Sequence, residues 1–351
     1  MLLLNYRPVL RQPTGIGVYA NGVLPALQGL EHRLIPGGGG GGAKERLARL
    51  LWSQTRLPGL ARQAGASLIF TPAPEGYLGR QTIPQVVMVH DLRPISHPER
   101  SLQSLYFRSW VPPLLRRCHR VITNSQFTAA EIQRHTGLAA GRIAVIPLGY
   151  DEQLFQPPAP GQLRQLPPVL ENLIGPYLLH LGQAYPHKNL ERLIRAFAGV
   201  ARTHPELGLV LAGKPHGRET PRLQGLVAAL GLQRQVRFVP YVPYDQLADL
   251  YRGALALVYP SLWEGFGLPV LEAMACGTPV LTSFGSGTEE VAADAALLIN
   301  PTDPDAMAEA LAALARQPQL RDDLRRRGLA RAAGFSWQRT GAATRELLAR
   351  C

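Results

Sequence analysis

Short apolar runs recur along the whole chain, and each is separated from the next by a longer segment with a helix-like pattern. Runs that are apolar throughout, without polar alternation, are typical of parallel strands buried on both faces of a sheet. The runs lie at residues 2–5, 33–36, 67–70, 85–90, 120–125 and 143–149, and then at 177–182, 207–213, 236–242, 254–261, 278–283 and 295–300. This repeat predicts an α/β chain with two doubly wound, Rossmann-like domains in tandem.

The segment between the two sets of runs is rich in proline and has no strand pattern. Its prolines, at positions 157, 158, 160, 167 and 168, indicate a semi-stiff connector. We therefore place one domain at 1–170 and a second at 171–335. Ser336 is a suitable N-cap for an amphipathic helix over 336–351, which we expect to pack back across the domains. The glycine run at 37–42 predicts a mobile loop, either a tolerated surface insertion or a flap beside a cleft.

Bulk properties narrow the class of protein. No apolar run reaches the roughly 18 residues of a membrane-spanning helix, and the apolar part of the N-terminus is too short for a signal peptide. Three cysteines far apart, Cys118, Cys276 and Cys351, suggest neither disulfides nor a zinc site. We therefore expect a cytoplasmic protein. The net charge of +12 raises the question of an anionic partner, which could be a phosphorylated substrate, a membrane surface or a nucleic acid.

The segment EGFGLPVLEAMACGTPV, residues 264–280, carries the strongest functional signal. Pro269 suits the first turn of a short helix over 269–276, and Gly277 suits the left-handed position just after it. In open α/β sheets, ligands bind beyond the carboxyl ends of the strands, which is where this helix begins. Three backbone amides would there face an anion, most naturally a diphosphate: those of Phe266, Gly267 and Leu268.

Two glutamates eight positions apart accompany this helix. Glu264 lies in the preceding loop, where its carboxylate can accept hydrogen bonds from a hydroxylated group beside the anion. Glu272 lies about one turn into the helix, where it can bind a ribose diol. Carboxylates pair with hydroxyls and not with phosphates, so the constellation fits a sugar nucleotide. The alternative is a well-capped helix with two solvated glutamates.

The same segment resembles a motif of the retaining glycosyltransferases of family 4, which have the GT-B fold. The shared pattern is E-x7-E within PSLWEGFGLPVLEAMACGTPVL. Other segments match the family in the expected order: TGIGVYA (14–20), VHDLRPISHPE (89–99), ITNSQFTAAEI (122–132) and HLGQAYPHKNLERLIRAF (180–197). The resemblance covers nearly the whole chain and is nearest to the mannosyltransferase-like branch that builds bacterial O-antigen and exopolysaccharide.

The resemblance implies roles for residues of the second domain. Glu264 would hold the hydroxyls of the donor sugar and stabilise its developing positive charge, and Glu272 would bind the ribose. Lys188 would bind the diphosphate together with the three amides, although a surface lysine near a helix start is the plainer alternative. Many family members have an arginine after the glycine of the nucleotide-domain loop. Here Gln183 follows Gly182, so an arginine not identified from sequence would share the phosphate charge.

In the first domain, the resemblance implies that Gly15 and Gly17 let an N-terminal loop close over the same group. The TGIG sequence alone is weak, because any tight turn uses glycine. His90 would lie near the transferred sugar. The alternative is that His90 and Asp91 form only a hydrogen-bonded pair at the end of a strand.

Two other segments have simpler explanations. The sequence DPD at 303–305 matches a metal-binding D-x-D pattern, but Asp303 suits a helix N-cap and Pro304 the first helical position. We predict no metal. The basic stretch RSWVPPLLRRCHR at 108–120 has the composition of a segment that rests on an anionic membrane. Its two adjacent prolines favour a solvated face instead.

The segment around Glu264 and Glu272 predicts a sugar-nucleotide site, and the resemblance implies a retaining glycosyltransferase whose donor is GDP-mannose first and a UDP-sugar next. The donor would bind mostly to the second domain and a glycan or lipid-linked acceptor to the first, with no tightly bound cofactor. A sugar-nucleotide epimerase on the same fold is the alternative. A basic nucleic-acid-binding protein ranks below both, because no basic and aromatic cluster typical of such proteins occurs. Peripheral contact with the inner face of the membrane stays open.

Overall fold

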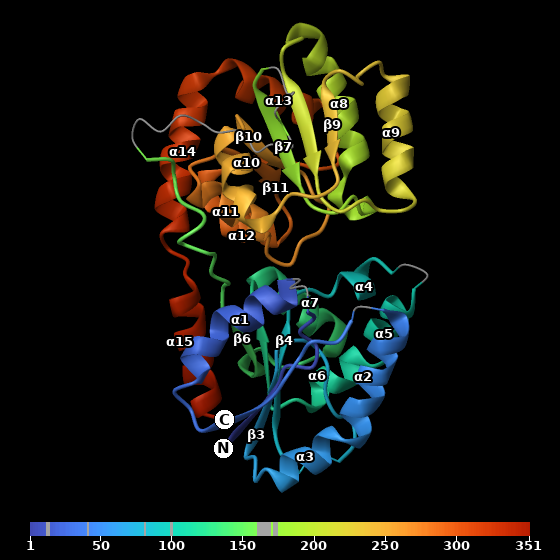
Figure 1. Cartoon of the computed structure of the whole chain (residues 1–351), viewed down its shortest axis with the longest axis vertical. Helices are drawn as coiled ribbons and strands as arrows, with labels where there is room; N and C mark the ends of the chain where they lie inside the picture. Colours follow the sequence, from blue (N-terminus) through green and yellow to red (C-terminus); the bar gives the residue numbers. More distant parts are fainter. Residues whose placement is uncertain (12–14, 41, 81, 99–100, 160–169, 171–174) are drawn as a thin grey trace. The chain divides into compact units, whose positions relative to one another are not determined.

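The computed structural model describes residues 1–11, 15–40, 42–80, 82–98, 101–159, 170 and 175–351 (Figure 1). These residues form two compact units. The first consists of Met1–Gly149 and Phe335–Cys351, and the second of Tyr150–Gly334. Each unit contains a six-stranded parallel sheet, and every strand expected from an apolar run is present. The expectation of two doubly wound α/β domains is therefore confirmed.

The sheet of the first unit has the strand order β2-β1-β3-β4-β5-β6. Its strands are β1 (Leu2–Asn5), β2 (His32–Ile35), β3 (Leu68–Thr71), β4 (Gln85–Val89), β5 (Arg120–Thr123) and β6 (Ile143–Val145). Strands β1, β3 and β4 are buried at every residue. Helices on both faces of the sheet leave no solvated side for these strands, which is why their runs are apolar without alternation.

The helices of the first unit are α1 (Gly15–Leu27), α2 (Ala43–Thr55), α3 (Leu57–Gln63), α4 (Arg93–Ser96), α5 (Leu102–Ser109), α6 (Val111–Arg117), α7 (Gln126–Thr136) and α15 (Trp337–Ala349). A 3-10 turn, η1 (Ala140–Arg142), precedes β6. In the 108–120 stretch, α6 turns Val111, Leu114 and Leu115 into the core. That stretch therefore presents mainly arginines to solvent, together with Trp110, which is 37% exposed.

The C-terminal helix α15 packs on α1, so the end of the chain belongs to the first unit (Figure 1). Ser336 caps α15 as expected, since its hydroxyl accepts a hydrogen bond from the Arg339 amide at 3.1 Å. The two helices approach closely at Gly22, where a Cβ would come within 2.4 Å of the Trp337 ring. We expected this helix to pack back across the domains; it follows the second unit in the sequence, and its contact with α1 assigns it to the first unit.

The sheet of the second unit has the order β12-β11-β10-β7-β8-β9. Its strands are β7 (Tyr177–Leu181), β8 (Gly208–Ala212), β9 (Val236–Val239), β10 (Ala256–Tyr259), β11 (Val280–Ser283) and β12 (Leu297–Ile299). Its helices are α8 (Leu190–Thr203), α9 (Glu219–Ala229), α10 (Leu247–Gly253), α11 (Leu268–Ala275), α12 (Gly287–Ala292), α13 (Pro304–Arg316) and α14 (Pro318–Ala332), with 3-10 turns η3 (Pro186–Lys188), η4 (Tyr244–Gln246) and η5 (Ala293–Ala295).

The change from one unit to the other comes earlier than the expected boundary near residue 170. The reason is that the start of the connector packs on the second unit. Phe155 is 1% exposed and makes edge contacts with Tyr244 and Tyr251, both at 5.9 Å between ring centroids. Arg252 donates hydrogen bonds to the carbonyls of Leu154 and Gln156. Most of the remaining proline-rich connector lies outside the described residues.

The strand order reverses once in each sheet, beside the first strand of that unit. In the first unit the chain forms β1 and β2 and then crosses to β3 on the other side of β1. In the second unit it forms β7, β8 and β9 and then crosses to β10 on the other side of β7. Loops leaving such a reversal diverge to opposite faces and open a crevice at the carboxyl edge, which is the usual ligand position in open α/β sheets.

The glycine run is partly packed. Gly38 donates a backbone hydrogen bond to the Val9 carbonyl at 2.8 Å, and a Cβ on Gly37 would come within 2.4 Å of that oxygen. Gly39 forms an isolated bridge with Leu10. The described glycines at 37–39 therefore lie against the turn after β1, whereas Gly41 falls outside the described residues.

Asp303 caps α13 as predicted, since its carboxylate accepts from the amides of Asp305 and Ala306 at 3.0 Å each. Pro304 is the first helical residue. Among the described residues, no helix has both the length and the apolar character that a bilayer crossing requires.

Candidate active site

Segment 264–280 folds as its proline and glycine spacing predicts. Helix α11 spans Leu268–Ala275, one residue earlier at each end than expected. Pro269 lies in its first turn, and Gly277 follows its end with φ of 71°. The helix starts in the loop after β10, at the carboxyl edge beside the reversal of strand order.

The start of α11 is held tightly. Gly267 has φ of 97°, and a Cβ there would come within 2.5 Å of the Thr288 methyl group. The amide of Gly287 donates to the Glu264 carbonyl at 2.9 Å, which fixes the loop against α12. In the described part of the chain, the amides of Gly267 and Leu268 have no hydrogen-bond acceptor. Both lie at the positive end of the helix, a position that suits an anion.

Lys188 and Glu264 form an ion pair beside this helix start. Lys188 Nζ lies 2.5 Å from Glu264 Oε1 and donates to the Tyr259 hydroxyl at 2.6 Å. The side chains of the pair are only 12% and 14% exposed. Burial opposes the charge on Lys188, but the Glu264 carboxylate and the Tyr259 oxygen outweigh it and raise the Lys188 pKa. The cluster therefore keeps a buried cation next to a carboxylate, and the plain surface-lysine interpretation does not fit.

Asn189 explains why Lys188 lies there. Asn189 adopts a left-handed backbone with φ of 62°, which asparagine tolerates better than most residues. Its buried side-chain amide donates to the carbonyls of Pro260 at 3.1 Å and Pro301 at 2.6 Å. These bonds join the start of α8 to the loops after β10 and β12. The short η3 turn that carries Lys188 is thereby fixed over the end of β10.

His180 packs against the same cluster through Tyr259. Its ring stacks on Tyr259 at 5.4 Å between centroids, and its Nδ1 lies 3.1 Å from the Val258 carbonyl. Burial and the nearby Lys188 charge lower the pKa of His180 to about 3, so the ring is neutral. A neutral ring beside a carbonyl carries its proton on Nδ1. His180, Tyr259 and Asn189 were not among the site residues predicted from the sequence.

Glu272 lies on α11 away from the ion pair. Tyr251 donates its hydroxyl to Glu272 Oε2 at 2.8 Å. Burial raises the pKa of Glu272 to about 7, although the Tyr251 hydrogen bond acts in the opposite direction. The site therefore contains two different carboxyl groups, Glu264 paired with a cation and Glu272 paired with a neutral phenol.

A cavity of about 190 Å³ lies beside the Gly182 loop. Its lining includes Gly213 after β8, Phe238 and Val239 at the end of β9, and Pro240 just after that strand. Gly213 has φ of 146°, and a Cβ there would come within 2.3 Å of the Gly182 carbonyl. Gln183, at the position where the family resemblance implied an arginine, donates to the Pro215 carbonyl at 3.4 Å near this cavity.

His90 lies at the end of β4 in the first unit. Its Nε2 is 3.1 Å from the Pro72 carbonyl, and its ring makes an edge contact with Tyr19 at 5.2 Å. Burial lowers the pKa of His90 to about 4, so the ring is neutral at pH 7. The proton then lies on Nε2, facing Pro72, and Nδ1 is an acceptor. Asp91 accepts from the Arg93 amide at 3.0 Å and so helps to begin α4.

Gly15 and Gly17 do not form the loop that was expected. Both lie in the first turn of α1, whose preceding residues 12–14 are outside the described part. Neither glycine has a positive φ, and a Cβ on Gly15 would meet no atom within 4 Å. Helix α1 places Tyr19 against His90, so this segment contacts the expected first-domain residue through a tyrosine.

Comparison with known proteins identifies the family. Residues 16–154 match the model described as Glycosyltransferase Family 4, and residues 167–331 match Glycosyl transferases group 1. The O-antigen chain mannosyltransferase B of Escherichia coli is 32% identical over 270 residues, which cover 76% of this chain and 70% of that protein. The chain belongs to glycosyltransferase family 4.

Another relative of this family 4 glycosyltransferase has a different name. The D-inositol 3-phosphate glycosyltransferase of Streptosporangium roseum is 34% identical over 64% of this chain. The match spans 53% of that relative, so this chain covers about half of its length.

Solved structures agree with the GT-B fold of this glycosyltransferase. Sucrose-phosphate synthase from Thermosynechococcus elongatus superposes with a TM-score of 0.80 at 22% identity, covering 99% of this chain and 98% of that one. HepE of Anabaena, solved in complex with UDP-glucose, gives a TM-score of 0.78 at 21% identity over 100% of both chains. At these identities the likeness shows the fold alone.

Proposed function

We propose that this glycosyltransferase transfers a sugar, mannose first, from a nucleotide-diphosphate sugar to a glycan or lipid-linked glycan, with retention of anomeric configuration. The observation that carries the proposal is the buried Lys188–Glu264 pair at the amide end of α11. That arrangement offers a cation and two amides to a diphosphate, and a carboxylate to the sugar attached to it. Relatives named as O-antigen mannosyltransferases support mannose and a polysaccharide product.

The chemistry follows from where charge develops. Breaking the anomeric bond makes the diphosphate more negative and the sugar more positive. Lys188 and the amides of Gly267 and Leu268 would stabilise the leaving diphosphate, and Glu264 would stabilise the sugar. Fixed, partly buried charges do this better than water because they need little reorganisation. His90, neutral and on the first unit, would contact the transferred sugar through hydrogen bonds.

The nucleoside would bind to two other parts of the second unit. Glu272 would accept hydrogen bonds from the ribose hydroxyls, and the cavity beside Gly182 and Gly213 would take the base. GDP-mannose is the first choice of donor because of the mannosyltransferase relatives. A UDP-sugar is the second choice, since the HepE structure was solved with UDP-glucose. No divalent metal is needed in this scheme, because Lys188 and the helix supply the positive charge.

A peripheral membrane contact fits a lipid-linked acceptor, and we place it on α2 and α5 instead of 108–120. Leu47 and Leu51 on α2 are 56% and 53% exposed, and Leu102 and Leu105 on α5 are 65% and 61% exposed. The hydrogen bond from Arg46 to Gln103 joins the two helices. An apolar patch on a chain of net charge +12 suits an anionic lipid surface.

Thermal-shift measurements with GDP-, UDP-, ADP- and dTDP-sugars test the donor. We expect stabilisation by GDP-mannose, unchanged by a metal chelator. With acceptor present, NMR of the product then determines the anomeric configuration of the transferred sugar. Without acceptor, NMR of the donor determines whether the configuration at C2 or C4 of its sugar has changed. Retention in an acceptor-dependent product supports the proposal. An epimerised donor formed without acceptor would support the epimerase alternative, and no stabilisation by any nucleotide sugar would refute both.

A further inference from the structure

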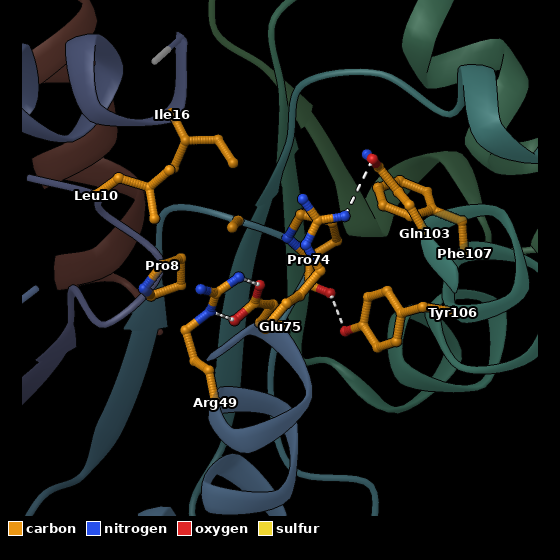
Figure 2. Close-up of a pocket in the computed structure, with 11 residues that line it drawn as sticks. Pro8, Leu10, Ile16, Arg49, Pro74, Glu75, Gln103, Tyr106 and Phe107 are labelled. Carbon is orange, nitrogen blue, oxygen red and sulfur yellow. Dashed lines mark hydrogen bonds and ion pairs between the residues drawn. The ribbon is translucent and has the colours of Figure 1, made fainter. Parts of the chain in front are cut away.

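We propose that a cavity at the strand reversal of the first unit binds one neutral sugar residue of the acceptor. The inference rests on the proposed function, since it names the acceptor chemistry of the same reaction. The cavity has a volume of about 250 Å³ and is lined by residues from α1, α2, α5 and the loops after β1 and β3 (Figure 2). Small-molecule pockets generally start at about 300 Å³. A monosaccharide therefore suits this space better than a nucleotide does.

The position of the cavity is the first argument. Pro8 and Leu10 follow β1, and Ala73, Pro74 and Glu75 follow β3. Strands β1 and β3 are the two neighbours between which the strand order reverses. The ends of parallel strands at such a reversal are the usual ligand position of an open α/β sheet. The second unit has the Lys188–Glu264 pair at its own reversal, and the first unit has this cavity.

The walls are the second argument. Pro8, Leu10 and Ile16 form one side, and Figure 2 shows them across the cavity from Phe107 and Tyr106. Apolar and aromatic walls pack on the C–H faces of a pyranose ring. The turn that carries Leu10 is held by the bridge to Gly39, so this wall is fixed by the backbone.

The polar groups are the third argument. Glu75 is 7% exposed and receives two hydrogen bonds from Arg49, from Nε and Nη2, both at 2.7 Å. Arg46 Nη1 donates to Gln103 Oε1 at 3.1 Å. Tyr106 donates its hydroxyl to the Pro74 carbonyl at 2.7 Å. These bonds fix the planar side chains of Glu75, Arg46 and Gln103. Each of them keeps further hydrogen-bonding capacity for a ligand, such as the side-chain NH2 of Gln103 (Figure 2).

This mixture of donors and acceptors selects hydroxyl groups. Each sugar hydroxyl both donates and accepts, so it can bond the carboxylate of Glu75 and the guanidinium of Arg46 or the amide of Gln103. A fully ionised phosphate monoester has no hydrogen-bond donor for Glu75 and would be repelled by that carboxylate. The chemistry therefore favours a neutral pyranose over a phosphorylated group.

The cavity also adjoins a residue of the proposed reaction. His90 Nε2 is 3.1 Å from the carbonyl of Pro72, and Ala73, the next residue, lines the cavity. A sugar in the cavity would therefore contact Ala73, the residue that directly follows the hydrogen-bond partner of His90. An acceptor held there would have its reacting end near the group assigned to the transferred sugar.

The test uses the full chain and saturation-transfer NMR with the methyl α-pyranosides of mannose, glucose and galactose. We expect the wild type to bind at least one of them, and Arg46→Ala and Gln103→Ala to weaken that binding about five- to tenfold. Arg62→Ala and Gln133→Ala are matched controls, because these exposed side chains lie on α3 and α7 outside the cavity. Both controls should bind like the wild type.

Stabilisation by nucleotide sugars is measured on the same variants, so that donor and acceptor failures are distinguishable. Nucleotide stabilisation retained in all variants, together with glycoside binding lost only in the cavity variants, supports the inference. Glycoside binding that is undetectable in the wild type, or equal in all variants, overturns it while leaving the donor proposal intact. Binding of inorganic phosphate that depends on Arg46 in the absence of glycoside binding also overturns it. Loss of nucleotide binding in the wild type refutes the proposed function instead.

Discussion

Lys188 and Glu264 were both selected from sequence, but their pairing was not. They are 76 positions apart, and only the folded loops after β7 and β10 bring Nζ within 2.5 Å of Oε1. For the same reason, the sequence did not predict roles for Tyr259, His180 and Asn189. Each acts through a long-range contact, such as the bond from Asn189 to Pro301 over 112 positions. A residue type that is ordinary in a strand or turn gives no local signal of that role.

Replacing Glu264 by glutamine should mainly slow the transfer. The amide keeps the volume and a hydrogen-bonding oxygen but removes the charge that would face the developing positive sugar. We expect kcat to fall about 10²- to 10³-fold while donor affinity changes far less. Steady-state kinetics and nucleotide titration provide the two values. The matched control is Glu309→Gln on the exposed side of α13, and equal kcat in both variants would remove Glu264 from the mechanism.

Glu272 should make stability depend on pH. Its pKa in the folded protein, about 7, exceeds the ordinary value of 4.5 because of burial. The folded state therefore binds more protons than the unfolded state between these values, and the free energy of unfolding decreases as pH rises through that window. Glu272→Gln has no such proton to lose. Its stability relative to the wild type should be greater at pH 8 than at pH 5, by on the order of 1 kcal/mol after allowance for its partial exposure.

Urea unfolding of both proteins at the two pH values measures this difference. Groups other than Glu272 titrate equally in wild type and variant, so the comparison isolates this carboxyl. A relative stability that does not change with pH would mean that Glu272 has an ordinary pKa.

At the scale of elements, helix α11 was predictable and its neighbours were not. Pro269 and Gly277 act through their own backbone, so they mark the helix ends to within one residue. The expected glycine loop at Gly15 and Gly17 proved to be helical, because a glycine pair alone does not specify a turn. The central strands were predictable for a physical reason: a parallel strand buried on both faces, such as β1, β3 or β4, must be largely apolar.

Gly267→Ala should damage the start of α11. A Cβ at φ of 97° is strained, and it would meet the Thr288 methyl group at 2.5 Å. We expect a loss of about 1–3 kcal/mol in the free energy of unfolding, together with weaker stabilisation by the nucleotide sugar. Gly199→Ala is the matched control, because it lies within α8 with open space around it. That control should be neutral or stabilising by about 0.5–1 kcal/mol.

The α2 and α5 surface gives a second prediction for an element. Leu102→Glu with Leu105→Glu should reduce sedimentation with phosphatidylglycerol vesicles by more than half, because both exposed leucines lose their apolar contact. Leu230→Glu, exposed on the second unit, is the control and should sediment like the wild type. Equal binding of all three proteins would place any membrane contact elsewhere. Vesicles of phosphatidylcholine alone report the part of the binding that does not depend on anionic lipid.

For the whole molecule, the repeat of apolar runs predicted two Rossmann-like units in tandem, but the sequence did not predict the residue at which one unit ends and the other begins. The proline-rich composition marked the connector, whereas the packing of Phe155 and the hydrogen bonds from Arg252 decide which unit its start joins. The packing of the C-terminal helix α15 on α1 similarly depends on the close approach between Gly22 and Trp337. Such complementarity of shape between distant segments has no periodic pattern.

Trp337→Ala should loosen the first unit alone. The Trp337 ring packs on α1 at Gly22, so its removal leaves a cavity that we expect to lower stability by about 2–4 kcal/mol. Hydrogen exchange read by mass spectrometry should accelerate in α1 and α15 and stay unchanged in residues 175–334. Uniform acceleration over both units would mean that they unfold as one.

The assignment of residues 335–351 to the first unit has a consequence for synthesis on the ribosome. The polypeptide leaves the first unit after Gly149 and returns to it at Phe335. The first unit therefore lacks α15 until the residues after Phe335 have been synthesised, whereas the second unit is complete once Gly334 has been added. A nascent chain would then finish the unit that contains the Lys188–Glu264 pair before the unit that contains His90.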